Sequence, residues 1–154
     1  PLLCLIAPGL GFGVLMILGT QFVLTGDYKH SSVLIALVPF FLINNLLLLN
    51  QYPDIQADTN AGRRHFPIAY GIDLSNKIYG LFATISVVLI ITYVLLGYAP
   101  TLGLLALIPM PLAFYALHGM IKHGEDVGGF PQYLAANVMV SILTPLLLAI
   151  SLLF

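Results

Sequence analysis

The sequence predicts an all-α protein, a polytopic transmembrane bundle of about five helices. Of its residues, 60% are hydrophobic and only 7% are charged, whereas charged residues make up about a quarter of a typical soluble domain. The apolar residues form five long runs, each close to the roughly 20 residues that a helix needs to cross a bilayer. None of the runs alternates apolar with polar residues, so helices are favoured over barrel strands.

The first helix is expected over 2–25. Gly9 and Gly13 lie four residues apart in it, a spacing that lets two helices approach closely. The second helix is expected over 32–61, because Gly62 can take the left-handed conformation that commonly follows a helix end. This helix would continue past its apolar stretch and carry an acidic segment at the membrane surface.

The remaining helices are expected at 76–97, 101–121 and 133–154. Prolines interrupt several of the runs, and each removes one backbone hydrogen bond. We expect these prolines to kink the helices and to open room between them. They are Pro8, Pro39, Pro53, Pro109, Pro111 and Pro145.

The charged side chains are unevenly distributed between the connections. Most of the positive and negative side chains lie in the connections near 54–75 and 119–132 and at the helix start that follows the first connection. The connection at 26–31 holds only Asp27 and Lys29. By the positive-inside rule, the richer face and the N-terminal end are cytoplasmic. Five cations without a basic patch exclude a nucleic-acid partner. The connection at 119–132 is expected to be a solvated loop or a lid over the acidic segment.

Asn50, Asp54 and Asp58 have the spacing i, i+4, i+8, which places them along one stripe of a helix. Two carboxylates one turn apart repel each other unless a cation lies between them, and hard oxygen ligands suit Mg²⁺. Arg63 and Arg64 follow closely, and guanidinium groups suit phosphate oxygens. The alternative is a solvated, charged helix end.

These residues resemble a known motif. The run 50–58, followed by Gly62-Arg63 and by 68–71, resembles the second aspartate-rich motif of the UbiA superfamily of intramembrane aromatic prenyltransferases. The segment 19–26 is similar to the preceding helix in the menaquinone-type branch, which prenylates dihydroxynaphthoate. The resemblance implies that 1–154 is the C-terminal half of a UbiA-like nine-helix domain, with an N-terminal half carrying the other aspartate motif as its partner.

The resemblance implies a Mg²⁺-dependent enzyme. It would transfer a polyprenyl group from polyprenyl diphosphate to an aromatic acceptor, in quinone or menaquinone biosynthesis at the bacterial cytoplasmic (inner) membrane. Asp54 and Asp58 would be catalytic and bind the metal with Asn50, while Arg63, Arg64 and Lys77 would bind diphosphate. The candidates for shielding a carbocation or lining the substrate cavity are Tyr52, Tyr70, Tyr79, Asn45 and Gln21.

Two other functions stay open. One is an ion-binding segment of a transporter or channel, and the other is a non-catalytic relative of the family. A transport site should lie near the bilayer midplane with charged residues on several helices, whereas Asp54 and Asp58 are expected at one membrane surface. Among enzymes of the superfamily, a haem- or chlorophyll-directed prenyltransferase also stays open, because Thr59 and His65 depart from the usual motif.

Overall fold

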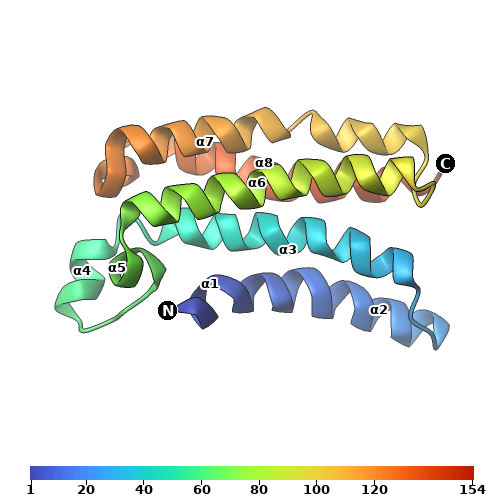
Figure 1. Ribbon diagram of the computed structural model, residues 1–154, viewed down its shortest axis with the longest axis horizontal. Coiled ribbons are helices and arrows are strands. Elements are labelled where there is room, and N and C mark those ends of the chain that lie inside the picture. Colours follow the sequence, from blue (N-terminus) through green and yellow to red (C-terminus); the bar gives the residue numbers. More distant parts are fainter.

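The computed structural model describes all residues 1–154 and consists of helices and their connections. Five helical segments are long and apolar enough to cross a membrane, and they run side by side along the long axis of the molecule (Figure 1). The predicted all-α polytopic bundle is therefore confirmed. The segments are Leu2–Thr25, His30–Asn50, Ile72–Leu95, Thr101–Gly129 and Pro131–Ser151.

The first segment is a nearly continuous helix in three parts. α1 (Leu2–Gly9) is followed by a π-helical stretch, η1 (Leu10–Leu15), and by α2 (Met16–Thr25). The π-helical stretch directly follows the Pro8-Gly9 pair. The backbone N–H of Gly9 donates to the side-chain Oδ1 of Asn44 at 2.7 Å, so the neighbouring helix satisfies a donor at this irregular point.

Gly9 and Gly13 lie where this helix packs against α3 (His30–Asn50). A Cβ atom on Gly9 would collide with the carbonyl oxygen of Phe40, and one on Gly13 would lie 2.6 Å from the Phe40 nitrogen. Gly11, between them, faces open space. The close helix approach predicted from the glycine spacing is therefore confirmed.

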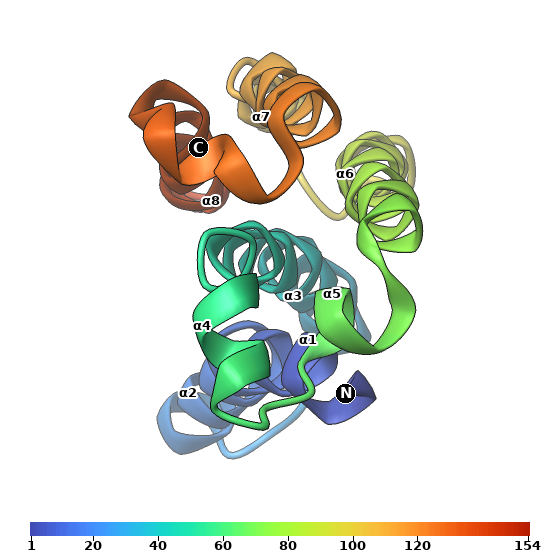
Figure 2. The same cartoon turned by 90° about the vertical axis from the view of Figure 1, so that its left-hand side faces the viewer.

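α3 lies at the centre of the bundle. It contacts α1 and η1 on one side, and α6 (Ile72–Leu95) and α8 (Pro131–Ser151) on the other. Figure 2 shows this end-on, with α3 between the α1–α2 segment and the group formed by α6, α7 (Met110–His123) and α8. The acidic segment that follows α3 is thus anchored to the most enclosed helix.

The fourth segment changes its helix type along its length. It begins as a 3-10 helix, η2 (Thr101–Leu107), continues as α7 (Met110–His123), and ends as a second 3-10 helix, η3 (Gly124–Gly129). Pro109 and Pro111 stand at the junction of η2 and α7, where a proline costs least because the first N–H groups of a helix have no internal partner.

A layer of polar side chains crosses the middle of the bundle between two apolar clusters. Asn45 on α3 donates from Nδ2 to the Tyr79 carbonyl on α6 at 2.9 Å. The Tyr79 hydroxyl donates to Oδ1 of Asn137 on α8 at 2.7 Å, and Asn137 Nδ2 donates back to the Asn45 carbonyl at 3.2 Å. The closed cycle fixes the relative rotation of three helices, because a rotation of any one would leave buried polar groups unpaired.

The single helix expected over 32–61 is wrong. α3 ends at Asn50, and a separate short helix, α4 (Ile55–Asn60), follows after a turn. Pro53 has no N–H to donate to the Leu49 carbonyl, which instead accepts from Tyr52 N–H at 3.0 Å. Figure 1 shows α4 turned away from the line of α3. Asn50 is therefore not on a common helical stripe with the two aspartates.

Candidate functional site

The charged side chains gather at one end of the bundle. That end holds α4, the one-turn helix α5 (Phe66–Tyr70), η3 and the N-terminus, while the C-terminus lies at the other (Figure 1). The connections and helix ends there carry four of the five cations and five of the six carboxylates, all but Lys29 and Asp27. The grouping expected from the sequence is present, while the membrane side that it faces stays a prediction.

The chain reverses sharply after α4 at Gly62. This residue has φ of +73°, a conformation that costs side-chain-bearing residues about 1–2 kcal/mol. The Gly62 N–H donates to the Thr59 carbonyl at 3.0 Å, and the Arg63 N–H donates to the Asp58 carbonyl at 2.9 Å. This pair of bonds is a Schellman motif. The left-handed stop predicted at Gly62 is confirmed, and it places Arg63 directly beside Asp58.

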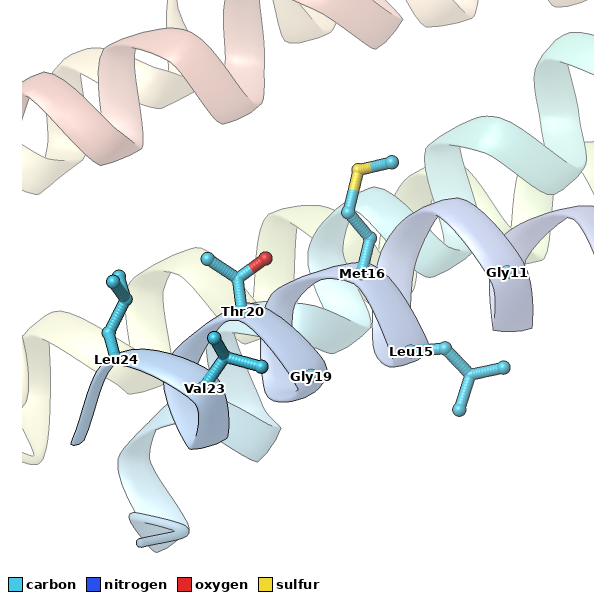
Figure 3. A pocket seen from close by; sticks show the side chains of 7 residues that line it. All are labelled: Gly11, Leu15, Met16, Gly19, Thr20, Val23 and Leu24. Carbon is cyan, nitrogen blue, oxygen red and sulfur yellow. The ribbon is translucent and has the colours of Figure 1, made fainter. Parts of the chain in front are cut away.

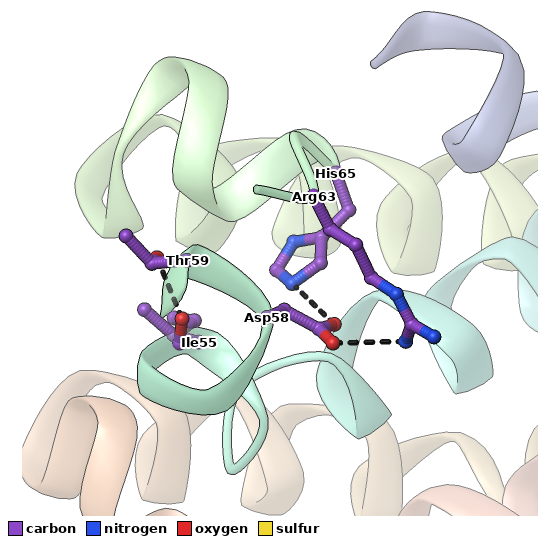
Figure 4. A network of polar contacts seen from close by, with 5 residues as sticks. All are labelled: Ile55, Asp58, Thr59, Arg63 and His65. Carbon is purple, nitrogen blue, oxygen red and sulfur yellow. Dashed lines mark hydrogen bonds and ion pairs between the residues drawn. The ribbon is translucent and has the colours of Figure 1, made fainter. Parts of the chain in front are cut away.

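Both carboxylate oxygens of Asp58 face a nitrogen, as Figure 4 shows. Arg63 Nη1 donates to Oδ1 at 2.9 Å, and His65 Nε2 lies 3.1 Å from Oδ2. The histidine contact is short enough for an ion pair, but neither ring nitrogen has a hydrogen-bond partner. The Asp58 side chain is 16% exposed and that of Arg63 is 72% exposed, so solvent reaches the pair mainly from the Arg63 side.

Asp54 lies one helical turn before Asp58 in spite of the break. It occupies the N-cap position of α4, and its carbonyl accepts from the Asp58 N–H at 2.8 Å. Its carboxylate is exposed and makes no hydrogen bond or ion pair. Asn50 lies across the break, and Arg64 is exposed without an ion pair. The structure therefore keeps the two aspartates together and separates them from Asn50.

Asp54 and Asp58 are the candidate carboxylate ligands for Mg²⁺ at this end of the bundle. No group of three or more His, Cys, Asp or Glu side chains is arranged to hold a metal ion. Magnesium, however, usually takes only one or two carboxylates from a protein and completes its octahedron with water and substrate phosphates. Asp54 and Asp58 supply two hard carboxylates at an accessible bundle end, and these residues fit that mode of binding.

Tyr52 lies under the turn between α3 and α4 and is fully buried. Its hydroxyl donates to Oδ1 of Asn76 on α6 at 2.9 Å, which ties the turn to the bundle. Burial raises the pKa of the Tyr52 hydroxyl above its ordinary range. The side chain therefore stays neutral, and the structure places its ring in the core instead of an open cavity.

The other sequence candidates are scattered. Tyr79 and Asn45 belong to the polar layer. Gln21 is part of α2, which extends toward the bundle end opposite α4 (Figure 1), and it does not line the pocket along η1 and α2 that Figure 3 shows. Lys77 on α6 is exposed and makes no ion pair. Tyr70 is half exposed and lines a cavity beside α4. Of the proposed lining residues, only Tyr70 therefore faces open space next to the aspartate segment.

The loop after α7 contacts the segment that carries the aspartates, and the Asp54 carboxylate stays exposed. Glu125 in η3 accepts a hydrogen bond at Oε2 from Gln56 Nε2 on α4, at 2.9 Å. A Cβ atom on Gly128 would lie 2.9 Å from the Pro53 Cβ, so η3 also packs against the break. These contacts join residues about seventy positions apart, and no local signal in the sequence indicates them.

Residues 1–141 match the family model described as the UbiA prenyltransferase family. The chain belongs to this family. No curated protein and no solved structure matches it. UbiA family members are prenyltransferases, and together with five apolar helices the match indicates an integral membrane protein that acts on prenyl substrates.

Proposed function

We propose that this UbiA family chain carries half of the active site of a Mg²⁺-dependent aromatic prenyltransferase. Asp54 and Asp58 would bind the metal and, with it, the diphosphate of a polyprenyl donor. The observation that supports this most directly is the contact between Asp58 and Arg63 at 2.9 Å, one helical turn from Asp54. The proposed metal ligand and the proposed phosphate-binding cation are therefore in direct contact.

In this proposal, a metal ion replaces the Arg63 guanidinium as the partner of the Asp58 carboxylate. An exposed ion pair contributes only about 0–1 kcal/mol, so a metal ion can replace the guanidinium at small cost. The Arg63 side chain is 72% exposed and is then free to present its planar donors to phosphate oxygens. Asp58 keeps its place meanwhile, because backbone hydrogen bonds fix α4 and the turn after it.

Prenyl transfer requires the donor's carbon–oxygen bond to break, with negative charge developing on the leaving diphosphate. Bound magnesium would supply Lewis-acid stabilisation of that charge. In this proposal Arg63 binds the same diphosphate oxygens, with Arg64 and Lys77 as further cations at this end. Tyr70 offers an exposed aromatic face to an allylic cation, a contact worth about 0.5–2 kcal/mol.

The proposal also covers the acceptor class, the other half of the site and the orientation in the membrane. The aromatic acceptor would belong to quinone or menaquinone biosynthesis. An N-terminal half with a second aspartate motif would complete the site, and the charged end would face the cytoplasm. Four of the five cations lie at that end, which supports the orientation through the positive-inside rule.

The geometry gives less support to a transporter or channel segment. Such a site needs charged or ion-binding side chains near the bilayer midplane. The middle of this bundle instead holds neutral Asn45, Tyr79 and Asn137, which bond to one another. The carboxylates and cations lie at the ends of the bundle, which favours chemistry at a membrane surface.

The test is prenyl transfer in membranes that contain the protein, with a labelled polyprenyl diphosphate and one of four acceptors: dihydroxynaphthoate, hydroxybenzoate, homogentisate, or 1-naphthol as a ring without a carboxylate. Asp54→Asn and Asp58→Asn should each lower Mg²⁺-dependent transfer by about a hundredfold or more. Asp126→Asn, an exposed acid at the same end, should retain activity. Retained turnover in both site variants would refute the metal role, and inactivity of the wild-type protein with every acceptor would favour a non-catalytic relative.

A further inference from the structure

The cavity beside α4 that Tyr70 lines contains none of the residues proposed to bind the metal or the diphosphate. Its walls come from α4, α5, the start of α6 and η3, and its volume is about 630 Å³. Binding sites for small organic molecules commonly measure about 300–1,000 Å³. The cavity is therefore large enough for a substrate with one or two rings.

One part of the wall suits a flat aromatic ring. Ile55, Pro67 and Ile72 supply apolar surface, and Tyr70 supplies an aromatic face. The Tyr70 ring is supported from behind by Phe66, with their ring centroids 4.9 Å apart. Aromatic pairs favour offset or tilted contacts at such distances, so the Tyr70 ring is already held in position to stack.

The rest of the wall is acidic. Asp73 and Glu125 line the cavity, and no lysine or arginine does. Gln56 donates to one oxygen of Glu125 at 2.9 Å, which fixes this carboxylate and leaves its other oxygen for a further donor. Carboxylates accept hydrogen bonds from hydroxyl groups and repel anions. A diphosphate or a ring carboxylate is disfavoured here, whereas a neutral phenol or hydroquinone finds acceptors.

The cavity and the aspartate pair share the same short helix. Successive residues on a helix are about 100° apart, so the stripe of Ile55 and Thr59 lies beside the stripe of Asp54 and Asp58. Figure 4 shows Asp58 pointing to Arg63 and His65, while Thr59 points to another side of α4. A ring in the cavity and a diphosphate at Asp58 would thus occupy neighbouring faces of one helix.

We propose that this cavity is the acceptor subsite and that it selects uncharged hydroxylated aromatic rings over rings that carry a carboxylate. The assignment rests on the proposed prenyltransferase function. It runs against dihydroxynaphthoate, the carboxylated acceptor that the menaquinone-type resemblance implies. Tyr70 provides the stacking surface, and Asp73 with Glu125 provides the charge that discriminates.

The experiment compares two fluorescent rings that differ by one carboxylate, 1-naphthol and 1-hydroxy-2-naphthoate. Saturable binding to the purified protein in lipid nanodiscs is measured against nanodiscs without protein. We expect 1-naphthol to bind about tenfold or more tightly than the naphthoate, because two carboxylates repel the anion. The double substitution Glu125→Gln with Asp73→Asn should reduce this preference to about twofold or less.

Asp126→Asn is the matched control, because Asp126 adjoins Glu125 in η3 but does not line the cavity; it should keep the wild-type preference. Equal or tighter binding of the naphthoate to the wild-type protein overturns the proposal, as does a preference that survives the double substitution. Asp58→Asn should abolish prenyl transfer and leave 1-naphthol binding intact. Selective ring binding without transfer to any acceptor would reject the enzymatic function and retain the ring site.

Discussion

Arg63 holds Asp58 at two points. Its backbone N–H donates to the Asp58 carbonyl at 2.9 Å, and its Nη1 donates to the Asp58 carboxylate at 2.9 Å. The first bond belongs to the turn at Gly62 and does not depend on the side chain at position 63. The second is an exposed ion pair that a ligand can displace. The structural and chemical roles of this residue can therefore be separated by mutation.

Arg63→Ala should change stability by about 1 kcal/mol or less, because the guanidinium side of the pair is exposed to solvent. In the proposed function, it should raise the KM for the polyprenyl diphosphate by about tenfold or more, since a charge-assisted hydrogen bond to phosphate is lost. Arg64→Ala, which removes a neighbouring exposed cation without an ion pair, is the control and should have the smaller effect. Equal KM changes in the two variants would assign no special role to Arg63.

Gly62→Ala should destabilise the turn by about 1–2 kcal/mol, because φ of +73° is unfavourable for any residue with a Cβ atom. The destabilised turn should be cleaved earlier by a protease between α4 and α5. In the proposed function, the affinity for the diphosphate donor should also be weaker. Gly129→Ala is the matched control, since Gly129 has no positive φ and no atom within 4 Å of its Cβ position. Similar protease sensitivity in both variants would contradict the strain argument.

Gly13→Ala should lower the thermal stability of the detergent-solubilised protein, with a cost of about 1–3 kcal/mol for overpacking. Its added methyl group would meet the Phe40 backbone at 2.6 Å, and a helix backbone cannot move aside as a flexible side chain can. Gly11→Ala meets nothing within 4 Å and should be neutral. A Gly11 variant as unstable as the Gly13 variant would show that the π-helical backbone, not the helix contact, requires glycine.

Tyr52→Phe should cost about 1 kcal/mol at neutral pH through loss of the hydrogen bond to Asn76. The pKa of Tyr52 is raised in the folded protein, so the fold favours the protonated phenol. Its contribution is complete below the unfolded pKa of about 10 and is lost as the pH rises above that value.

Chemical unfolding of the wild-type and Tyr52→Phe proteins at pH 8 and pH 11 measures this effect. The stability difference between them should shrink at the higher pH. Tyr98→Phe, at an exposed position near the other end, should show no such pH-dependent difference. A constant difference between Tyr52→Phe and wild type at both pH values would mean that the hydroxyl is not protected by burial.

The helices could be predicted because long apolar runs and glycine spacing are local signals. The run beginning near residue 32 and the spacing of Gly9 and Gly13 each led to a feature that the structure contains. The sequence does not predict the break after Asn50, although Pro53 interrupts the expected helix. A proline in a helix produces either a kink or an end, and the choice depends on whether neighbouring groups satisfy the freed carbonyl.

The site could be predicted only in part, because only some of its contacts join residues that are close in the sequence. The pairing of Asp54 with Asp58 and the stop at Gly62 follow from spacing within one turn. The contact of Asp58 with His65 depends on how the chain folds back after Gly62, and that of Gln56 with Glu125 depends on the packing of η3. Spacing in the sequence does not determine contacts of this kind.

The break between α3 and α4 separates the membrane-spanning helix from the short helix that carries the candidate site. α3 is constrained by helix packing on several sides, so changes in it are costly. α4 is six residues long, and most of its side chains are exposed. If α4 holds the proposed site, substitutions on this short helix can change ligand affinity without disturbing the long helices that hold the protein in the bilayer.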